Sequence, residues 1–145
     1  MEGLLRTAEE SLTAREYGQA VQIAAEVLRR DDSVLRANRV MAHALTVQAR
    51  HEEAIPFLER VCQFSAATFD ERRLLADSYR EAGRTERAAA QYESLLEFDA
   101  RFVHAINELG LIALDAGDLD EAQRVELGLG LVRLSAELGE RLDRR

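Results

Sequence analysis

The fold is decided by four short segments that recur at a constant period of 34 and end in alanine: Tyr17-Gly-Gln-Ala20, His51-Glu-Glu-Ala54, Thr85-Glu-Arg-Ala88 and Leu119-Asp-Glu-Ala122. Two further columns of residues keep the same period. The first contains small residues, Ala8, Ala42, Ala76 and Gly110. The second contains apolar residues, Val27, Val61, Leu95 and Leu129. Three columns in phase, without an insertion or deletion, predict four copies of one structural repeat.

Each repeat has the apolar spacing of two helices. In residues 69–102, Leu75, Ala76 and Tyr79 fall on one helical face, and a second stripe runs from Ala88 to Leu96. Gly83 lies between the stripes, where a helix would end. We therefore expect two antiparallel helices per repeat, joined by a tight turn that is plainest at residues 81–84 and 115–118.

Composition agrees with an all-helical protein. The 145 residues include no Trp and 6% aromatic residues, whereas Ala, Leu, Glu and Arg dominate. One helix pair cannot bury its apolar face alone, so neighbouring pairs must stack into a continuous core. The sequence predicts an all-α solenoid that forms a single domain over residues 1–145.

The repeat resembles the tetratricopeptide repeat family. The resemblance rests on the 34-residue spacing, the small residue at repeat position 8 and the segment Gly117-Asp-Leu-Asp-Glu-Ala122. It covers repeats 1–34, 35–68, 69–102 and 103–136. The sequence departs from the family at position 4 and lacks the proline at position 32, so no subfamily is identified. The resemblance implies a right-handed superhelix whose concave groove is lined by the first helix of each repeat.

The C-terminal segment breaks the rhythm, because too few residues follow Leu129 for another helix pair. Its leucines form one helical stripe, Leu127, Leu131, Leu134, Leu138 and Leu142. We expect a prolonged or capping helix at about 130–145, which would cover the end of the solenoid. The alternative is a homodimer contact through Leu131, Leu134, Leu138 and Leu142.

Nothing in the sequence indicates catalysis. His43, His51 and His104 lack a second ligand at metal-binding spacing, and no glycine-rich phosphate loop is present. The single cysteine, Cys62, is expected in the core. We therefore predict no enzyme activity, no cofactor and no metal site. His51 is expected to be exposed.

The charge of the chain restricts the kinds of partner that we expect, and its cysteine content and apolar segments indicate a cellular compartment. The net charge of −8 disfavours nucleic acid. One cysteine, no signal peptide and no membrane-spanning stretch predict a cytoplasmic protein. Every basic residue is arginine, which is typical of a GC-rich, bacterial genome.

The resemblance also implies which side chains line the groove. At repeat positions 2, 5, 9 and 12 the candidate peptide-binding residues are Arg36, Arg39, His43, Arg73, Asp77, Arg80, His104, Asn107 and Leu111. Leucines are expected toward the groove ends, at Leu5, Leu12, Leu111 and Leu114. The arginines form a basic island in an acidic protein. Two interpretations stay open: a ligand-binding island, or a salt-bridge lattice that includes an Arg73–Asp77 pair.

The favoured function is a protein-interaction module, an adaptor or scaffold that binds a peptide segment of a partner in its groove. The two-carboxylate clamp of chaperone-binding tetratricopeptide domains is not reproduced. Its positions hold Leu5, Glu9 and Val40 when counted from the first repeat, and Arg39, His43 and Leu74 when counted from the second. One alternative is a bacterial secretion-type chaperone for a client protein. The other is a self-assembling structural subunit.

Overall fold

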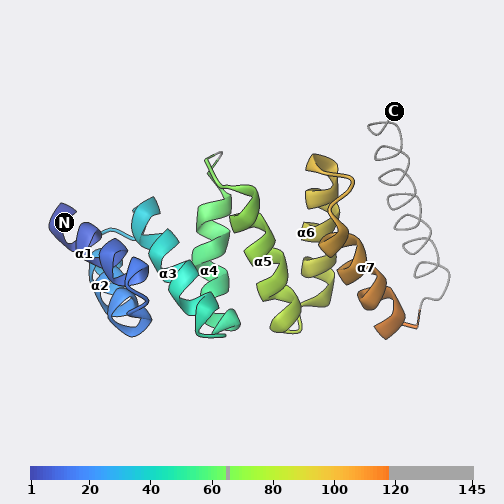
Figure 1. The fold of residues 1–145 in the computed structure, drawn as a ribbon, viewed down its shortest axis with the longest axis horizontal. Helices are drawn as coiled ribbons and strands as arrows, with labels where there is room; N and C mark the ends of the chain where they lie inside the picture. The colour runs from blue at the N-terminus through green and yellow to red at the C-terminus, as the bar shows by residue number, and fades with distance from the viewer. Residues whose placement is uncertain (65, 118–145) are drawn as a thin grey trace, which may run out of the picture. The chain divides into compact units, whose positions relative to one another are not determined.

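The computed structural model describes residues 1–64 and 66–117, and this part of the chain contains seven helices and no strand (Figure 1). The helices are α1 (Glu2–Thr13), α2 (Tyr17–Arg30), α3 (Leu35–Val47), α4 (His51–Cys62), α5 (Phe69–Glu81), α6 (Thr85–Phe98) and α7 (Val103–Asp115). The first helices α3, α5 and α7 begin one repeat length apart, as the sequence predicts. The expected capping segment, with Leu131, Leu134, Leu138 and Leu142, lies outside the described residues.

The repeat columns form the core wherever the structure describes them. Ala20, Ala54 and Ala88 are fully buried, and so are Val27 and Val61. The column of small residues on the first helices is buried as well, at Ala8, Ala42, Ala76 and Gly110. Small side chains at these positions let paired helices approach closely. The period of the sequence therefore reflects a helix contact that recurs from repeat to repeat.

The turn between the two helices of a repeat recurs at the same period. Arg15, Ala49, Gly83 and Gly117 all have a left-handed backbone, with φ of 63°, 59°, 78° and 76°. The hydrogen bonds that close the turn recur too. The amide N–H groups of Glu16, Arg50 and Arg84 donate to the carbonyls of Ser11, Leu45 and Tyr79, at 2.8, 2.9 and 2.8 Å. The first two repeats therefore make the same turn as the last two without glycine.

Two compact units divide the chain, Met1–Ala88 and the part that begins at Ala89. In the first unit α2 packs against α1 and α3, α3 packs against α1 and α4, and α4 packs against α5. Its core includes the fully buried side chains of Leu45, Ile55 and Leu58. In the second unit Tyr92 and Leu95 of α6 and Ala105 of α7 are buried.

Candidate functional site

Arg36, on α3, is bound by two carboxylates of α1. Its Nε and Nη2 donate to the two carboxylate oxygens of Glu9, each at 2.8 Å, and its Nη1 donates to Glu2 Oε1 at 2.9 Å. The hydrogen bond from Arg36 holds the pKa of Glu9 below its ordinary value. The first two repeats are therefore joined by a bidentate ion pair between their first helices, and the charge of Arg36 is neutralised there.

Arg39 makes the corresponding connection from α3 to α5. Its Nε and Nη2 donate to the carboxylate of Glu71, at 2.9 and 3.0 Å, and Nη2 also donates to the carbonyl of Ala66 at 2.9 Å. Glu71 additionally caps α5, because it accepts from the N–H of Thr68 at 3.0 Å while its own N–H donates to Thr68 Oγ1.

The carboxylate of Glu71 is only 5% exposed, so its ionisation depends on these donors. Burial acts to raise its pKa, but the hydrogen bonds from Arg39 and Thr68 outweigh burial and place the pKa below its ordinary value. His43 lies at the edge of this cluster, with its Nε2 3.9 Å from a carboxylate oxygen of Glu71. Arg39, Glu71 and Thr68 thus fix the start of α5 against α3.

Arg36 and Arg39 therefore form the salt-bridge lattice that the sequence left as one alternative. Arg73, on α5, differs from both. Its side chain is half-buried, and its buried Nε has no hydrogen-bond acceptor. No carboxylate of the described residues forms an ion pair with it, so the Arg73–Asp77 pair that one of the two interpretations included is not formed. Asp77 and Arg80 are half-buried on the same helix.

The second unit contributes the candidates on α7. Asn107 and Leu111 are exposed, whereas the ring of His104 packs edge-on against Tyr92 and Phe102, with ring centroids 5.9 and 5.7 Å apart. The sequence did not single out Val103, which is also exposed. The exposed stripe of α7 consists of Val103, Asn107, Leu111 and Leu114. The i, i+4, i+8 spacing of the first three residues could have revealed it.

Two sequence expectations about exposure are wrong. Leu5 was expected at the end of the groove, but it is 5% exposed and packs in a core cluster with Val27 and Ala37. Residues of α2 and α3 thus cover a side chain that the resemblance placed on the surface. His51 was expected to be exposed, but it is half-buried, and its Nδ1 is buried without a hydrogen-bond partner.

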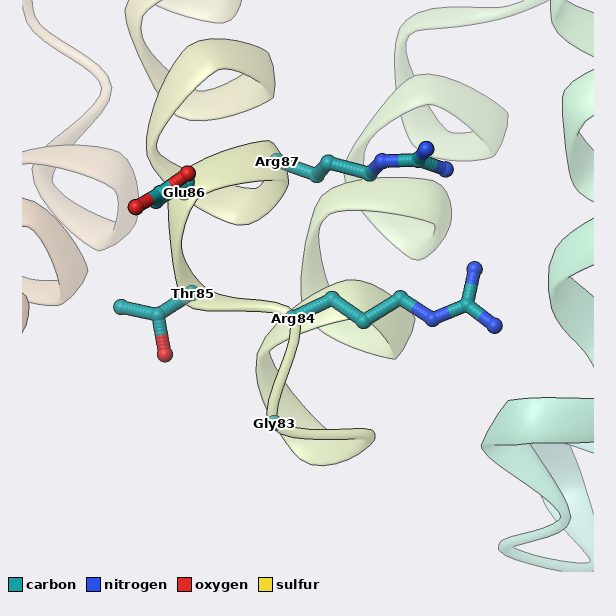
Figure 2. Close-up of a pocket in the computed structure, with 5 residues that line it drawn as sticks. All are labelled: Gly83, Arg84, Thr85, Glu86 and Arg87. Carbon is teal, nitrogen blue, oxygen red and sulfur yellow. The ribbon is translucent and has the colours of Figure 1, made fainter.

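A second lattice, which the sequence did not predict, lies at the turn into α6. Gly83 to Arg87 line a shallow hollow, where Arg84 and Arg87 point to the same side and Glu86 points away (Figure 2). Arg84 pairs with Glu52 of α4, and Arg87 Nη1 lies 3.8 Å from Glu59 Oε1.

The same Glu59 also binds a tyrosine. Tyr79 Oη donates to Glu59 Oε1 at 2.6 Å, and burial together with this carboxylate raises the pKa of Tyr79 to about 12. The phenol therefore stays protonated and keeps its hydrogen bond at neutral pH. The arginines at the turn into α6 and Tyr79 of α5 therefore bind carboxylates of α4 and connect these helices.

The remaining features are possible metal ligands, the single cysteine and the membrane-spanning potential of the helices. Within the described residues, no group of three His, Cys, Asp or Glu side chains is placed to hold a metal ion. Burial raises the pKa of Cys62, so its thiol is less ionised than a free cysteine. No helix in the described part of the chain has the length and apolar character needed to cross a membrane.

Comparison with known proteins agrees with the fold. Residues 73–136 match the tetratricopeptide repeat family. Several solved structures of MamA share the fold. MamA of strain AMB-1 is 14% identical over 96% of this chain and 76% of that chain, with a TM-score of 0.82. MamA from Desulfovibrio magneticus RS-1 is 19% identical over 92% and 76%, with a TM-score of 0.74. No curated protein matches the sequence.

Proposed function

We propose, from the premise that this chain is a tetratricopeptide repeat protein, that it is an interaction module whose first helices bind a peptide segment of a partner protein. The family match and the shared fold support an interaction or scaffold role. The proposal adds the surface: the faces of α1, α3 and α5 in the first unit, and the exposed stripe of α7 in the second.

The observation that carries the proposal is the fixed lattice on the first-helix face. Arg36 and Arg39 are bound bidentately, each to a carboxylate of a neighbouring first helix. A peptide that meets this face therefore finds polar side chains already held in one conformation, so less side-chain entropy is lost on binding. In the first unit, His43 and Arg73 offer further polar contacts beside the lattice. In the second unit, Asn107 and Leu111 offer a polar and an apolar side chain on α7.

The test uses peptides selected from a phage-displayed random library on the immobilised full chain. A selected peptide is synthesised, and its Kd is measured for the wild type and for His43→Ala and Leu111→Ala. Where the side chain belongs to the face that a selected peptide occupies, removing it should weaken that peptide about tenfold, and the two variants test the faces of the two units separately. Both side chains are substantially exposed, so the variants should keep their helical content.

Matched controls come from the second helices. Gln22→Ala on α2 and Glu93→Ala on α6 also truncate exposed side chains, and they should leave the Kd unchanged. A library that yields no binder would contradict the proposal. So would a peptide whose affinity falls with the α2 and α6 variants and not with the α3 and α7 variants.

A further inference from the structure

The exposed stripe of α7 differs in chemistry from the matching positions of the other first helices. Repeat positions 5, 9 and 12 hold Arg39, His43 and Thr46 on α3, and Arg73, Asp77 and Arg80 on α5. On α7 the same positions hold Asn107, Leu111 and Leu114. The fourth repeat therefore presents uncharged and mainly apolar side chains where the second and third repeats present charged and polar ones.

Three large apolar side chains of this stripe are exposed along one line of the helix. Val103, Leu111 and Leu114 are 40%, 48% and 50% exposed. They extend over about 16 Å of α7, because an α-helix rises about 1.5 Å per residue. A single exposed leucine is ordinary on a protein surface, but a line of this length can contact several apolar side chains of one peptide.

The charges on the first-helix face of the first unit balance one another. At repeat positions 2, 5, 9 and 12, the two acids of α1 are matched by the two arginines of α3, and α5 carries two of each. Arg36 is bound by Glu2 and Glu9, and Arg39 is bound by Glu71. A peptide carboxylate at either arginine would replace an existing carboxylate and leave that one without its donor, so little free energy would be gained.

Charge complementarity therefore selects an uncharged ligand. A charged side chain that is buried against the leucines of α7 would lose water without gaining a counter-ion, which is unfavourable. We infer that the partner segment is uncharged and apolar where it meets α7, with aliphatic side chains that lie along Val103, Leu111 and Leu114, an inference that rests on the proposed function. Binding of this segment does not depend on ion pairs.

The experiment begins with the peptides selected on the wild-type chain, synthesised with acetylated and amidated ends. Kd is measured by calorimetry from about 50 to about 500 mM NaCl, and it should stay constant within about twofold because apolar contacts are not screened by salt. Replacing an aliphatic residue of the peptide by Ala should weaken binding about tenfold. Replacing its charged residues by Gln should leave the Kd unchanged. This arm uses the wild-type fold, so it stands even if a variant of the chain is destabilised.

The stripe is then altered on the protein side. Leu114→Asn removes an apolar group from α7 without adding a charge, and it should weaken the peptide about tenfold. The Ala variant of the peptide that lost this contact should bind Leu114→Asn no more weakly than the unaltered peptide does. The control is Phe64→Asn, which changes a side chain of similar exposure, 43%, outside the first helices. It should bind as the wild type does.

The outcomes separate the two proposals. A peptide that needs His43 or Leu111, but whose Kd rises steeply with salt or with acid-to-amide changes, would overturn the apolar partner and leave the proposed function standing. So would a concentration-dependent mass of the free chain that Leu114→Asn abolishes, because a second copy would then cover the stripe. Amides of α7 that shift with Leu138→Asn and not with the peptide would assign the stripe to the chain's own leucines and overturn the inference too. Failure to select any peptide would overturn the proposed function and this inference with it.

Discussion

At the scale of the residue, the turns inside the repeats offer the sharpest contrast. Arg15 and Ala49 adopt a left-handed backbone that costs an ordinary residue about 1–2 kcal/mol, whereas Gly83 and Gly117 adopt it freely. We expect Ala49→Gly to raise the free energy of unfolding by about 1 kcal/mol and Gly83→Ala to lower it by a similar amount. Urea denaturation followed by helical signal measures both.

Gly18 is the control for this prediction. It lies in α2 at an ordinary φ, and a Cβ there would meet no atom within 4 Å, as is also true at Gly83. Gly18→Ala should therefore be neutral or stabilising, because alanine favours the helix. If Gly83→Ala were also stabilising, the left-handed backbone of the turn would not be strained for a residue that has a side chain.

The sequence predicted which residues of the repeat columns are buried, but it did not predict the backbone conformation of the turns. The buried columns, which include Ala8 and Ala88, could be predicted because small residues at a fixed period indicate a close helix contact that recurs in each repeat. The sequence predicted a tight turn in every repeat, but not the left-handed backbone at Arg15 and Ala49, because no glycine marks those two positions. Leu5 was misplaced because a family position was taken as exposed, while here Val27 and Ala37 cover it.

At the scale of the element, Glu71 fixes α5 against α3 and should make stability depend on pH. Its pKa is lowered in the folded chain, so the unfolded chain takes up a proton first as the pH falls. The contribution of Glu71 is therefore complete above the ordinary pKa of about 4.5 and is lost as the pH falls through the folded value. Glu71→Gln should lower the free energy of unfolding by about 2 kcal/mol at neutral pH.

The measurement is urea denaturation of the wild type and Glu71→Gln from neutral to acidic pH. The difference between them should shrink once the pH is below about 4.5. Glu10→Gln, which removes an exposed carboxylate of α1, should show no comparable difference at any pH. A Glu71→Gln deficit that stays constant into acid would mean that the carboxylate charge does not stabilise the start of α5.

Sequence could not have identified this cluster. Arg39 and Glu71 are 32 residues apart, and only the packing of α3, α4 and α5 brings them together. Local spacing pointed instead to Arg73 and Asp77, four residues apart on one helix, which do not pair. Periodicity identifies the helices and their buried faces. It does not identify the ion-pair partner of a long side chain, because that partner depends on the rotamer and on which helix packs nearby.

At the scale of the whole molecule, a repeat protein should respond locally to damage, because each repeat contacts only its neighbours. Arg36 ties α3 to Glu2 and Glu9 of α1. We expect Arg36→Gln to speed amide hydrogen exchange in α1 and α2 while α4 keeps its protection. Exchange followed by mass spectrometry on peptic fragments measures each helix separately.

Arg29→Gln is the control for local opening. It breaks an ion pair with Glu26 that lies within α2, so it removes a contact inside one helix and none between repeats. Exchange in α1 should stay as in the wild type. A uniform rise across α1 to α5 in Arg36→Gln would show that the first unit opens as one cooperative body and would contradict a nearest-neighbour description.

The central claim is that the first helices bind a peptide, and mapping backbone amides by NMR tests it most directly. A peptide selected on the wild type is titrated into the ¹⁵N-labelled full chain, and the shift of each amide is followed. The account predicts that the largest shifts fall in α3, α5 and α7, and that they include the amides around Leu111. Shifts concentrated in α2, α4 and α6 would contradict it.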